Sequence, residues 1–171
     1  DQLNVNGASN IRIEIRGSDN ADTILGSSRD ERFILREGND TLDGAGGWDT
    51  LRYDRSGVGA VTVDLGAGTA SGTWNGNAFV HTISNIEEVR GSRNDGDTLT
   101  GDANNNRFDG RGGNDTMDGG AGNDTFVGGA GNDTLTGGTG HEADERRVSR
   151  AYTTRKTPGR CATETSSEDT H

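Results

Sequence analysis

A nine-residue repeat constrains this chain more than any other feature of the sequence. Counted in nines from Gly101, the sequence reads GDANNNRFD, GRGGNDTMD, GGAGNDTFV and GGAGNDTLT. Glycine is frequent at the first, second and fourth positions, Asp or Asn occupies the sixth, and a large apolar residue occupies the eighth. A second block with the same spacing runs from Gly17 to Arg52. A fixed period of this kind is typical of repeat architectures, so we expect an all-β solenoid.

Each nonapeptide reads as a tight turn followed by a very short strand. The glycines permit backbone angles that other residues avoid, and the last three residues have the composition of a strand. Two nonapeptides then close an 18-residue coil with a strand on each side, and successive coils stack about 4.8 Å apart. This geometry predicts that Asp133 lies next to Asp115, eighteen residues away, and that Asp124 lies on the opposite edge.

The segment between the two blocks breaks the period but keeps strand signals. Asp49 and Asp97 are 48 residues apart, which is not a multiple of nine. Within 53–90, Ala60–Leu65 alternates apolar and polar residues, and Asn75-Gly76 is a hairpin-type turn between two strand-like pieces. We therefore expect longer, irregular β coils there. At the front, isoleucines alternate with charged residues over 11–16, which predicts a strand that begins or caps the stack.

The composition limits how much apolar packing can stabilise a fold of this chain. Leu, Ile, Val and Phe make up 27 of 171 residues, about 16%, and the net charge is −11, a combination typical of disorder. The first 140 residues carry the whole of that negative charge. An acidic surface repels nucleic acid and suits cations. One cysteine excludes an internal disulfide framework, no apolar run reaches the length of a membrane span, and 141–171 reads as a disordered tail.

The sixth position supplies the chemistry. Carboxylates in successive coils lie about 5 Å apart and repel each other by about 1 kcal/mol even in bulk water. A cation between them removes that repulsion, and glycine-rich turns leave backbone carbonyls free to bind the same ion. Oxygen ligands of this kind select Ca²⁺ over Zn²⁺ or Cu²⁺. We therefore expect several Ca²⁺ ions along the stack.

The pattern GGxGxDxUx, with U a large apolar residue, resembles the nonapeptide of the RTX (hemolysin-type) calcium-binding repeats. The match is nearly letter for letter over 119–136 and looser over 17–52, 92–118 and 137–140. The resemblance implies a parallel β-roll in which each Ca²⁺ lies between turns n and n+2. It also implies a secreted, extracellular or cell-surface protein that is exported by type I secretion machinery.

Carried over to matching positions, the resemblance implies carboxylate ligands at seven sites: Asp22, Asp40, Asp49, Asp97, Asp115, Asp124 and Asp133. It implies backbone carbonyl ligands from Gly110, Gly112, Gly119, Ala121, Asn123, Gly128, Ala130 and Asn132. Glu31 and Asn106 depart from the pattern, so we expect weak or empty sites there. Glu142 matches the spacing only.

Five segments follow from this interpretation. We expect a leading strand or cap at 1–16, a first repeat block at 17–52, an irregular β connector at 53–90, a second repeat block at 91–140 and the tail at 141–171.

Three functions fit the sequence. The first is a structural Ca²⁺-binding module of a larger secreted protein, which folds outside the cell and is joined to an upstream domain. The alternatives are the C-terminal part of a secreted protease, lipase or polysaccharide-modifying enzyme, and the spacer of a surface adhesin. The sequence has no pattern that places a nucleophile beside a general base, so we do not expect this chain itself to be catalytic.

Overall fold

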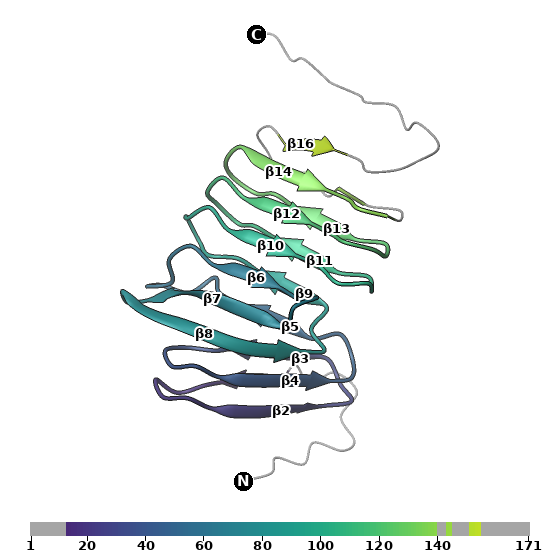
Figure 1. The fold of residues 1–171 in the computed structure, drawn as a ribbon. Helices are drawn as coiled ribbons and strands as arrows, with labels where there is room; N and C mark the ends of the chain where they lie inside the picture. The colour runs from purple at the N-terminus through teal and green to yellow at the C-terminus, as the bar shows by residue number, and fades with distance from the viewer. Residues whose placement is uncertain (1–12, 140–142, 145–150, 155–171) are drawn as a thin grey trace.

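The computed structural model describes residues 13–139, 143–144 and 151–154, and their secondary structure consists of strands and turns. The strands form two sheets that face each other across a narrow core (Figure 1). None of the described segments is a helix with the length and hydropathy that a membrane span requires.

The first sheet has seven strands, and every neighbouring pair in it is parallel. In spatial order they are β1 (Ile13–Arg16), β3 (Glu31–Ile34), β5 (Thr50–Arg52), β9 (Glu88–Arg90), β11 (Arg107–Asp109), β13 (Thr125–Val127) and β15 (Ala143–Asp144). Within the expected leading segment, β1 lies at the edge of this sheet, and residues 1–12 are outside the described part of the chain.

The second sheet has nine strands. In spatial order they are β16 (Ala151–Thr154), β14 (Asp133–Thr136), β12 (Thr116–Asp118), β10 (Thr98–Thr100), β6 (Thr62–Asp64), β7 (Thr69–Trp74), β8 (Asn77–Ser84), β4 (Thr41–Ala45) and β2 (Thr23–Ser27). Repeat strands along the chain therefore alternate between the two sheets.

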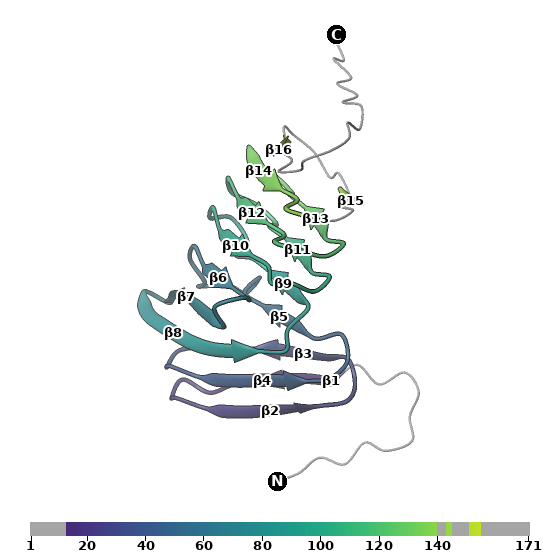
Figure 2. The same ribbon diagram turned by 45° about the vertical axis from the view of Figure 1, so that its right-hand side comes forward.

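The pairing register confirms the predicted 18-residue coil. In the nine-stranded sheet Thr98 pairs with Thr116, and Thr116 pairs with Thr134. In the seven-stranded sheet Arg107 pairs with Thr125, which is the same offset. Each nonapeptide therefore stacks on the one two repeats away, as Figures 1 and 2 show.

The eighth-position residues form the core, as expected from the alternation of side chains along a strand. Those of the second block are at most 2% exposed, and the rings of Phe108 and Phe126 on neighbouring strands lie 6.0 Å apart between centroids, tilted by 34°. The full set of buried eighth-position side chains is Phe33, Leu42, Leu51, Leu99, Phe108, Met117, Phe126 and Leu135, with Ile24 partly buried at the end of the stack.

The connector forms an antiparallel meander inserted into the nine-stranded sheet. β6, β7 and β8 pair antiparallel in sequence, and the outer two pair parallel with β10 and β4. Asn75 and Gly76, with φ of 50° and 85°, make the tight turn between β7 and β8, so the predicted hairpin is confirmed. The periodicity did not predict that this meander would join the two repeat blocks in one sheet.

The meander widens one side of the solenoid. Between β4 and β10 the nine-stranded sheet has three strands, whereas the seven-stranded sheet has only β9 between β5 and β11. Three stacked rings lie at this junction: Phe79 lies 4.3 Å from His81 and 5.6 Å from Tyr53, measured between centroids. Strands of the second block consequently lie at an angle to those of the first (Figure 2).

The expectation of a disordered tail falls mostly outside the described residues, and so does Glu142. Of the segment 141–171, the structure describes β15 and β16, which extend the two sheets beyond β13 and β14.

Candidate metal centre

The sixth-position residues stand where each turn enters its strand, and they form two columns. On the nine-stranded side the column contains Asp22 and Asp40 in the first block and Asp97, Asp115 and Asp133 in the second. On the seven-stranded side it contains Glu31, Asp49, Asn106 and Asp124. Residues eighteen apart are thus brought together, whereas Asp124 and Asp133 belong to different sheets.

Backbone hydrogen bonds join each column from turn to turn. The N–H of Asp97 donates to Oδ1 of Asp115 at 2.8 Å, and the N–H of Asp115 donates to Oδ1 of Asp133 at 3.0 Å. The pairs Asp22/Asp40, Glu31/Asp49 and Asn106/Asp124 repeat this bond at 2.8 to 2.9 Å. One carboxylate oxygen of each acceptor is therefore used in holding the stack.

The second carboxylate oxygen, Oδ2, has no hydrogen-bond partner in three of these aspartates. These are Asp40, Asp49 and Asp115, whose side chains are buried and at most 1% exposed. Leaving a buried anionic oxygen without a partner is costly, so such an atom calls for a bound cation.

Two other members of the columns have protein donors at this oxygen. Oδ2 of Asp22 accepts the N–H of Ser18 at 2.6 Å, and Oδ2 of Asp97 accepts the N–H of Ser92 at 2.7 Å. The carboxylates therefore form two groups, of which only one has a buried orphan oxygen.

A glycine at the first position makes room for the second oxygen. A Cβ on Gly110 would overlap Oδ2 of Asp115, and one on Gly128 would overlap Oδ2 of Asp133. In the first block a Cβ on Gly44 would lie 2.7 Å from Oδ2 of Asp49. The glycine leaves a cradle beside the carboxylate that any side chain would fill.

Burial changes the protonation of these carboxyls. It raises the pKa of Asp49 and Asp115 to about 7 and that of Asp97 to about 6, and it raises the pKa of Asp40. The charges of Asp97 and Asp133 contribute to the shift at Asp115. The columns therefore favour a proton or a cation over a bare charge.

Further ligands have to come from the backbone. Within the described residues, no group of three or more His, Cys, Asp or Glu side chains could hold a metal ion, and Ca²⁺ takes six to eight oxygens. Of the carbonyls predicted from sequence, that of Ala130 accepts the N–H of Gly113 at 2.9 Å, and that of Gly110 accepts the N–H of Gly112 at 3.1 Å. A carbonyl oxygen retains a second lone pair, so these bonds do not prevent coordination.

Sequence reasoning missed two members of the columns because both lie in the connector. Glu87 stands in line with Asp49, and its Oε2 accepts the N–H of Asp49 at 2.8 Å. It thus makes the same bond as a sixth-position aspartate. The signal that could have found it is an acidic residue directly before the strand that leads back into the second block.

His81 takes the corresponding place next to Asp40. Its Nδ1 accepts the N–H of Asp40 at 3.2 Å, and burial lowers the pKa of the imidazole to about 4, so the ring is neutral. A neutral imidazole ends the carboxylate column on the nine-stranded side, while Glu87 continues the other column across the junction.

Comparison with protein-family models agrees with this geometry. The model of the RTX calcium-binding nonapeptide repeat matches four copies, over residues 25–55, 93–126 and 118–141. The matched segments contain six of the seven predicted aspartates and all eight predicted carbonyls, whereas Asp22 and residues 56–92, which include most of the connector, lie outside them. The chain therefore carries repeats of the RTX calcium-binding nonapeptide family.

Proposed function

We propose that this chain is a structural module whose folding is coupled to Ca²⁺ held between turns eighteen residues apart. The observation that carries the proposal is the set of buried carboxylate oxygens without partners at Asp40, Asp49 and Asp115. Bound Ca²⁺ would supply the positive charge that those oxygens need. The proposed carboxylate ligands are Asp22, Asp40, Asp49, Asp97, Asp115, Asp124 and Asp133.

Glu31, Asn106 and Glu87 differ from the aspartate sites of the columns. The carboxylate of Glu31 accepts the N–H of Ser27 at 3.0 Å, a bond that Asp22 and Asp97 also make with a serine N–H, but its side chain is one methylene longer than the aspartate of the repeat pattern. The Nδ2 of Asn106 is buried without a partner, and an amide nitrogen facing the site disfavours a cation. We expect weak or empty sites at both. Glu87 joins the proposed ligands beside Asp49.

Coupling to folding follows from the balance of forces. Ordering the backbone costs about 1–2 kcal/mol per residue, and one apolar side chain per nonapeptide offsets little of it. Buried carboxylates oppose folding further unless a cation neutralises them. Binding free energy therefore becomes folding free energy.

The setting we propose is extracellular. Extracellular Ca²⁺ modules bind the ion with Kd of about 10⁻⁴–10⁻³ M, so a module of this kind stays unfolded in a low-calcium cytosol and folds outside. This order suits export of an unfolded chain through a type I secretion machinery. We propose an accessory role beside an upstream domain of a larger protein.

Two alternatives use the same module differently. The chain can be the C-terminal part of a secreted protease, lipase or polysaccharide-modifying enzyme, or the spacer of a surface adhesin. Turnover of a peptide, ester or polysaccharide substrate by the chain alone would favour the enzyme. Force resistance that depends on Ca²⁺, without turnover, would favour the spacer.

Far-UV circular dichroism tests the coupling. We expect little β signal in excess EDTA, full β signal in millimolar Ca²⁺, and a much smaller response to equal Mg²⁺, which requires a smaller octahedral site. Equal β content in EDTA and in Ca²⁺ would refute metal-coupled folding.

A further inference from the structure

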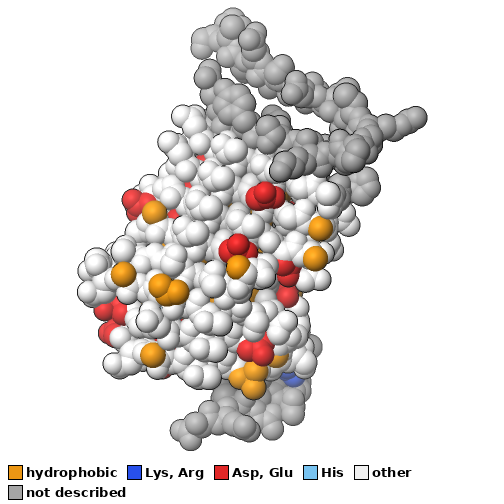
Figure 3. Space-filling view, in the orientation of Figure 1, with side chains coloured by type: hydrophobic (Ala, Val, Ile, Leu, Met, Phe, Trp, Pro, Cys, Tyr) orange, Lys and Arg blue, Asp and Glu red, His pale blue; other side chains and the backbone are white. Residues whose placement is uncertain are grey.

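The arginines of this acidic chain are distributed unevenly between its two sheets. Every arginine within a described strand belongs to the seven-stranded sheet: Arg16, Arg32, Arg52, Arg90 and Arg107. The described strands of the nine-stranded sheet contain none. Figure 3, which views the nine-stranded side, accordingly shows acidic side chains and scarcely any lysine or arginine. The two faces of the solenoid therefore differ in charge.

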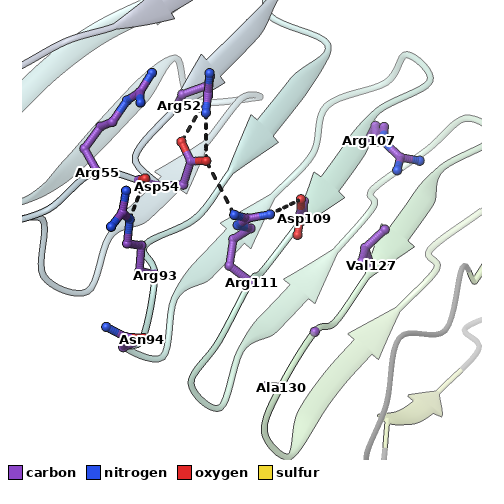
Figure 4. Close-up of a pocket in the computed structure, with 11 residues that line it drawn as sticks. Arg52, Asp54, Arg55, Arg93, Asn94, Arg107, Asp109, Arg111, Val127 and Ala130 are labelled. Atoms are coloured by element: carbon purple, nitrogen blue, oxygen red, sulfur yellow. Dashed lines mark hydrogen bonds and ion pairs between the residues drawn. The ribbon is translucent and has the colours of Figure 1, made fainter.

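Five arginines line one open cavity of about 910 Å³ along the seven-stranded sheet (Figure 4). We call it the arginine groove, and its cationic residues are Arg52, Arg55, Arg93, Arg107 and Arg111. Among the lining residues that the structure describes, Asp54 and Asp109 are acidic, so positive charge exceeds negative by three there. The lining comes from β5, β11 and β13 and from the turns after β5, β9, β11 and β13, so it runs along the solenoid axis.

Asp54 holds the groove in shape. It pairs with the guanidinium of Arg52 through both oxygens at 3.0 and 2.8 Å, and its backbone carbonyl accepts Nε of Arg93 at 3.0 Å. Asp54 is 5% exposed, and burial raises the pKa of its carboxyl; the hydrogen bonds and charge of Arg52, together with the charges of Arg111 and Arg55, lower that pKa below its ordinary value. Arg52 and Arg93 are thus held in place before any ligand arrives, which reduces the entropy lost on binding.

Arg111 points to a function for the groove. It occupies the second position of its nonapeptide with φ of 74°, where the next two repeats have Gly120 and Gly129 at 82° and 99°. A side chain is disfavoured in this left-handed region, and such strain recurs at functional sites. The side chain is 41% exposed, and its ion pairs to described residues are long, 3.5 Å to Asp109 and 3.7 Å to Asp54. It therefore retains hydrogen-bonding capacity toward the groove.

The lining indicates what the groove can bind. Guanidinium groups match carboxylates with paired hydrogen bonds. The turns after β5, β9 and β11 each supply one such group, from Arg55, Arg93 and Arg111, and neighbouring coils lie about 4.8 Å apart, which suits a chain of repeated anions. Asp54, Asp109 and Asn94 can bond hydroxyl groups between those anions, and Val127, Gly129 and Ala130 give a low surface for ring carbons. The lining that the structure describes contains no aromatic residue on which nucleic-acid bases could stack.

We propose that the arginine groove binds an acidic carbohydrate, a chain of sugar rings with carboxylate groups. This site is separate from the Ca²⁺ columns and gives the module a recognition role beyond its structural one. It requires only that the solenoid be folded.

The test uses the full chain in saturating Ca²⁺, with a short oligogalacturonate titrated by calorimetry at fixed free Ca²⁺. Circular dichroism first verifies the fold, so a failure of folding is distinguished from a failure of binding. We expect binding that weakens as NaCl increases, and no binding of a neutral oligosaccharide of the same length.

Arg111→Gly is the decisive variant because glycine relieves the backbone strain at this position. We expect affinity to fall by about tenfold, as for the loss of one paired carboxylate contact, with no decrease in Tm. Arg93→Gln should weaken binding independently. Arg36→Gln, whose guanidinium pairs with Asp19 at 3.2 Å away from the groove lining, is the control and should bind as the parent does.

Three results would overturn the proposal. Unchanged affinity in both groove variants would remove the groove from recognition. A lower Tm in Arg111→Gly would make Arg111 a structural residue. Tighter binding of polyglutamate or single-stranded DNA than of oligogalacturonate would make the ligand a peptide or a nucleic acid instead.

Discussion

At the sixth position of a nonapeptide, a single aspartate has two tasks. Asp115 shows both: its Oδ1 accepts the N–H of Asp97 from the neighbouring coil, while its Oδ2 is buried beside Gly110. The first oxygen stabilises the stack, and the second needs a cation. The glycine five residues earlier is what leaves room for both.

Replacing that glycine should therefore affect the site and the core together. In Gly110→Ala the new methyl group overlaps Oδ2 of Asp115 and the end of Met117, and overpacking of this kind costs about 1–3 kcal/mol. We expect a lower Tm and the loss of one Ca²⁺ ion by calorimetry. Gly46→Ala is the control, since its Cβ would meet nothing closer than 3.9 Å. An equal decrease in Tm and in bound Ca²⁺ in both variants would show that the space beside the Asp115 carboxylate is not required for binding.

Protonation of the columns gives a pH prediction for the metal-free chain. The folded-state pKa of Asp49 and Asp115 is raised from 3.8 to about 7, so these groups stabilise the fold while protonated, and that stability is lost as pH rises through 7. His81 acts in the opposite direction, but with a pKa lowered to about 4 its contribution is complete above the ordinary value of 6.5.

We therefore expect the residual far-UV β signal in EDTA to be weaker at pH 8 than at pH 6.5. In limiting Ca²⁺ the order should reverse, because protons compete with the ion for the same oxygens. Circular dichroism at both pH values, with EDTA and across a Ca²⁺ titration, measures this. A metal-free β signal that increases with pH would show that burial does not penalise the charged form of these carboxylates.

The nonapeptide as an element has its functional partner two repeats away. Strand pairing and the carboxylate hydrogen bonds both follow the offset of eighteen, so an ion site needs two turns that are not consecutive in sequence. Neighbours in the printed sequence, such as Asp124 and Asp133, serve different columns.

Double-mutant cycles distinguish these pairs. Asp115→Asn and Asp133→Asn should be coupled by about 0.5–3 kcal/mol in unfolding free energy measured in Ca²⁺, because they share a site. Asp124→Asn and Asp133→Asn should add to within about 0.5 kcal/mol, since they lie in different columns. Stronger coupling of the consecutive pair would mean that the stacking does not organise the metal sites.

The repeats were predictable from sequence, and the connector was predictable only in part. Periodicity nine determines which side chains face inward, from Leu99 to Leu135, because every coil repeats one local conformation. In the connector, the strand at Thr62–Asp64 and the turn at Asn75-Gly76 could be predicted from local sequence signals. The strands with which the connector pairs could not be predicted, because antiparallel pairing across the meander leaves no periodic pattern in the sequence.

The same limit explains what was missed in the sites. Glu87 and His81 enter the columns through tertiary pairing of β9 and β8, and no repeat marks them. The arginine groove has no signal in the sequence either, because its residues come from strands and turns that are adjacent only in the folded sheet.

At the scale of the whole molecule, the junction decides whether the two repeat blocks act as one unit. Phe79, Tyr53 and His81 stack there and are at most 1% exposed. One carboxylate column continues across the junction through Glu87, whereas the other ends at His81. Packing of this cluster, together with the single continuous column, is what couples the blocks.

Phe79→Ala should weaken that coupling. Removal of a fully buried aromatic ring costs about 3–5 kcal/mol, and we expect the single Ca²⁺-dependent unfolding transition to separate into two. Val80→Ala is the matched control, because Val80 is 58% exposed and should change stability by less than about 0.5 kcal/mol. A single transition retained in Phe79→Ala would show that the blocks are coupled elsewhere.

Whether Ca²⁺ lies between residues eighteen apart can be measured by anomalous scattering from crystals grown in Ca²⁺. We expect an anomalous peak about 2.3–2.6 Å from carboxylate oxygens of both Asp115 and Asp133, with backbone carbonyls completing the site. A peak shared by Asp124 and Asp133, or an ordered solenoid with no peak at the columns, would contradict it.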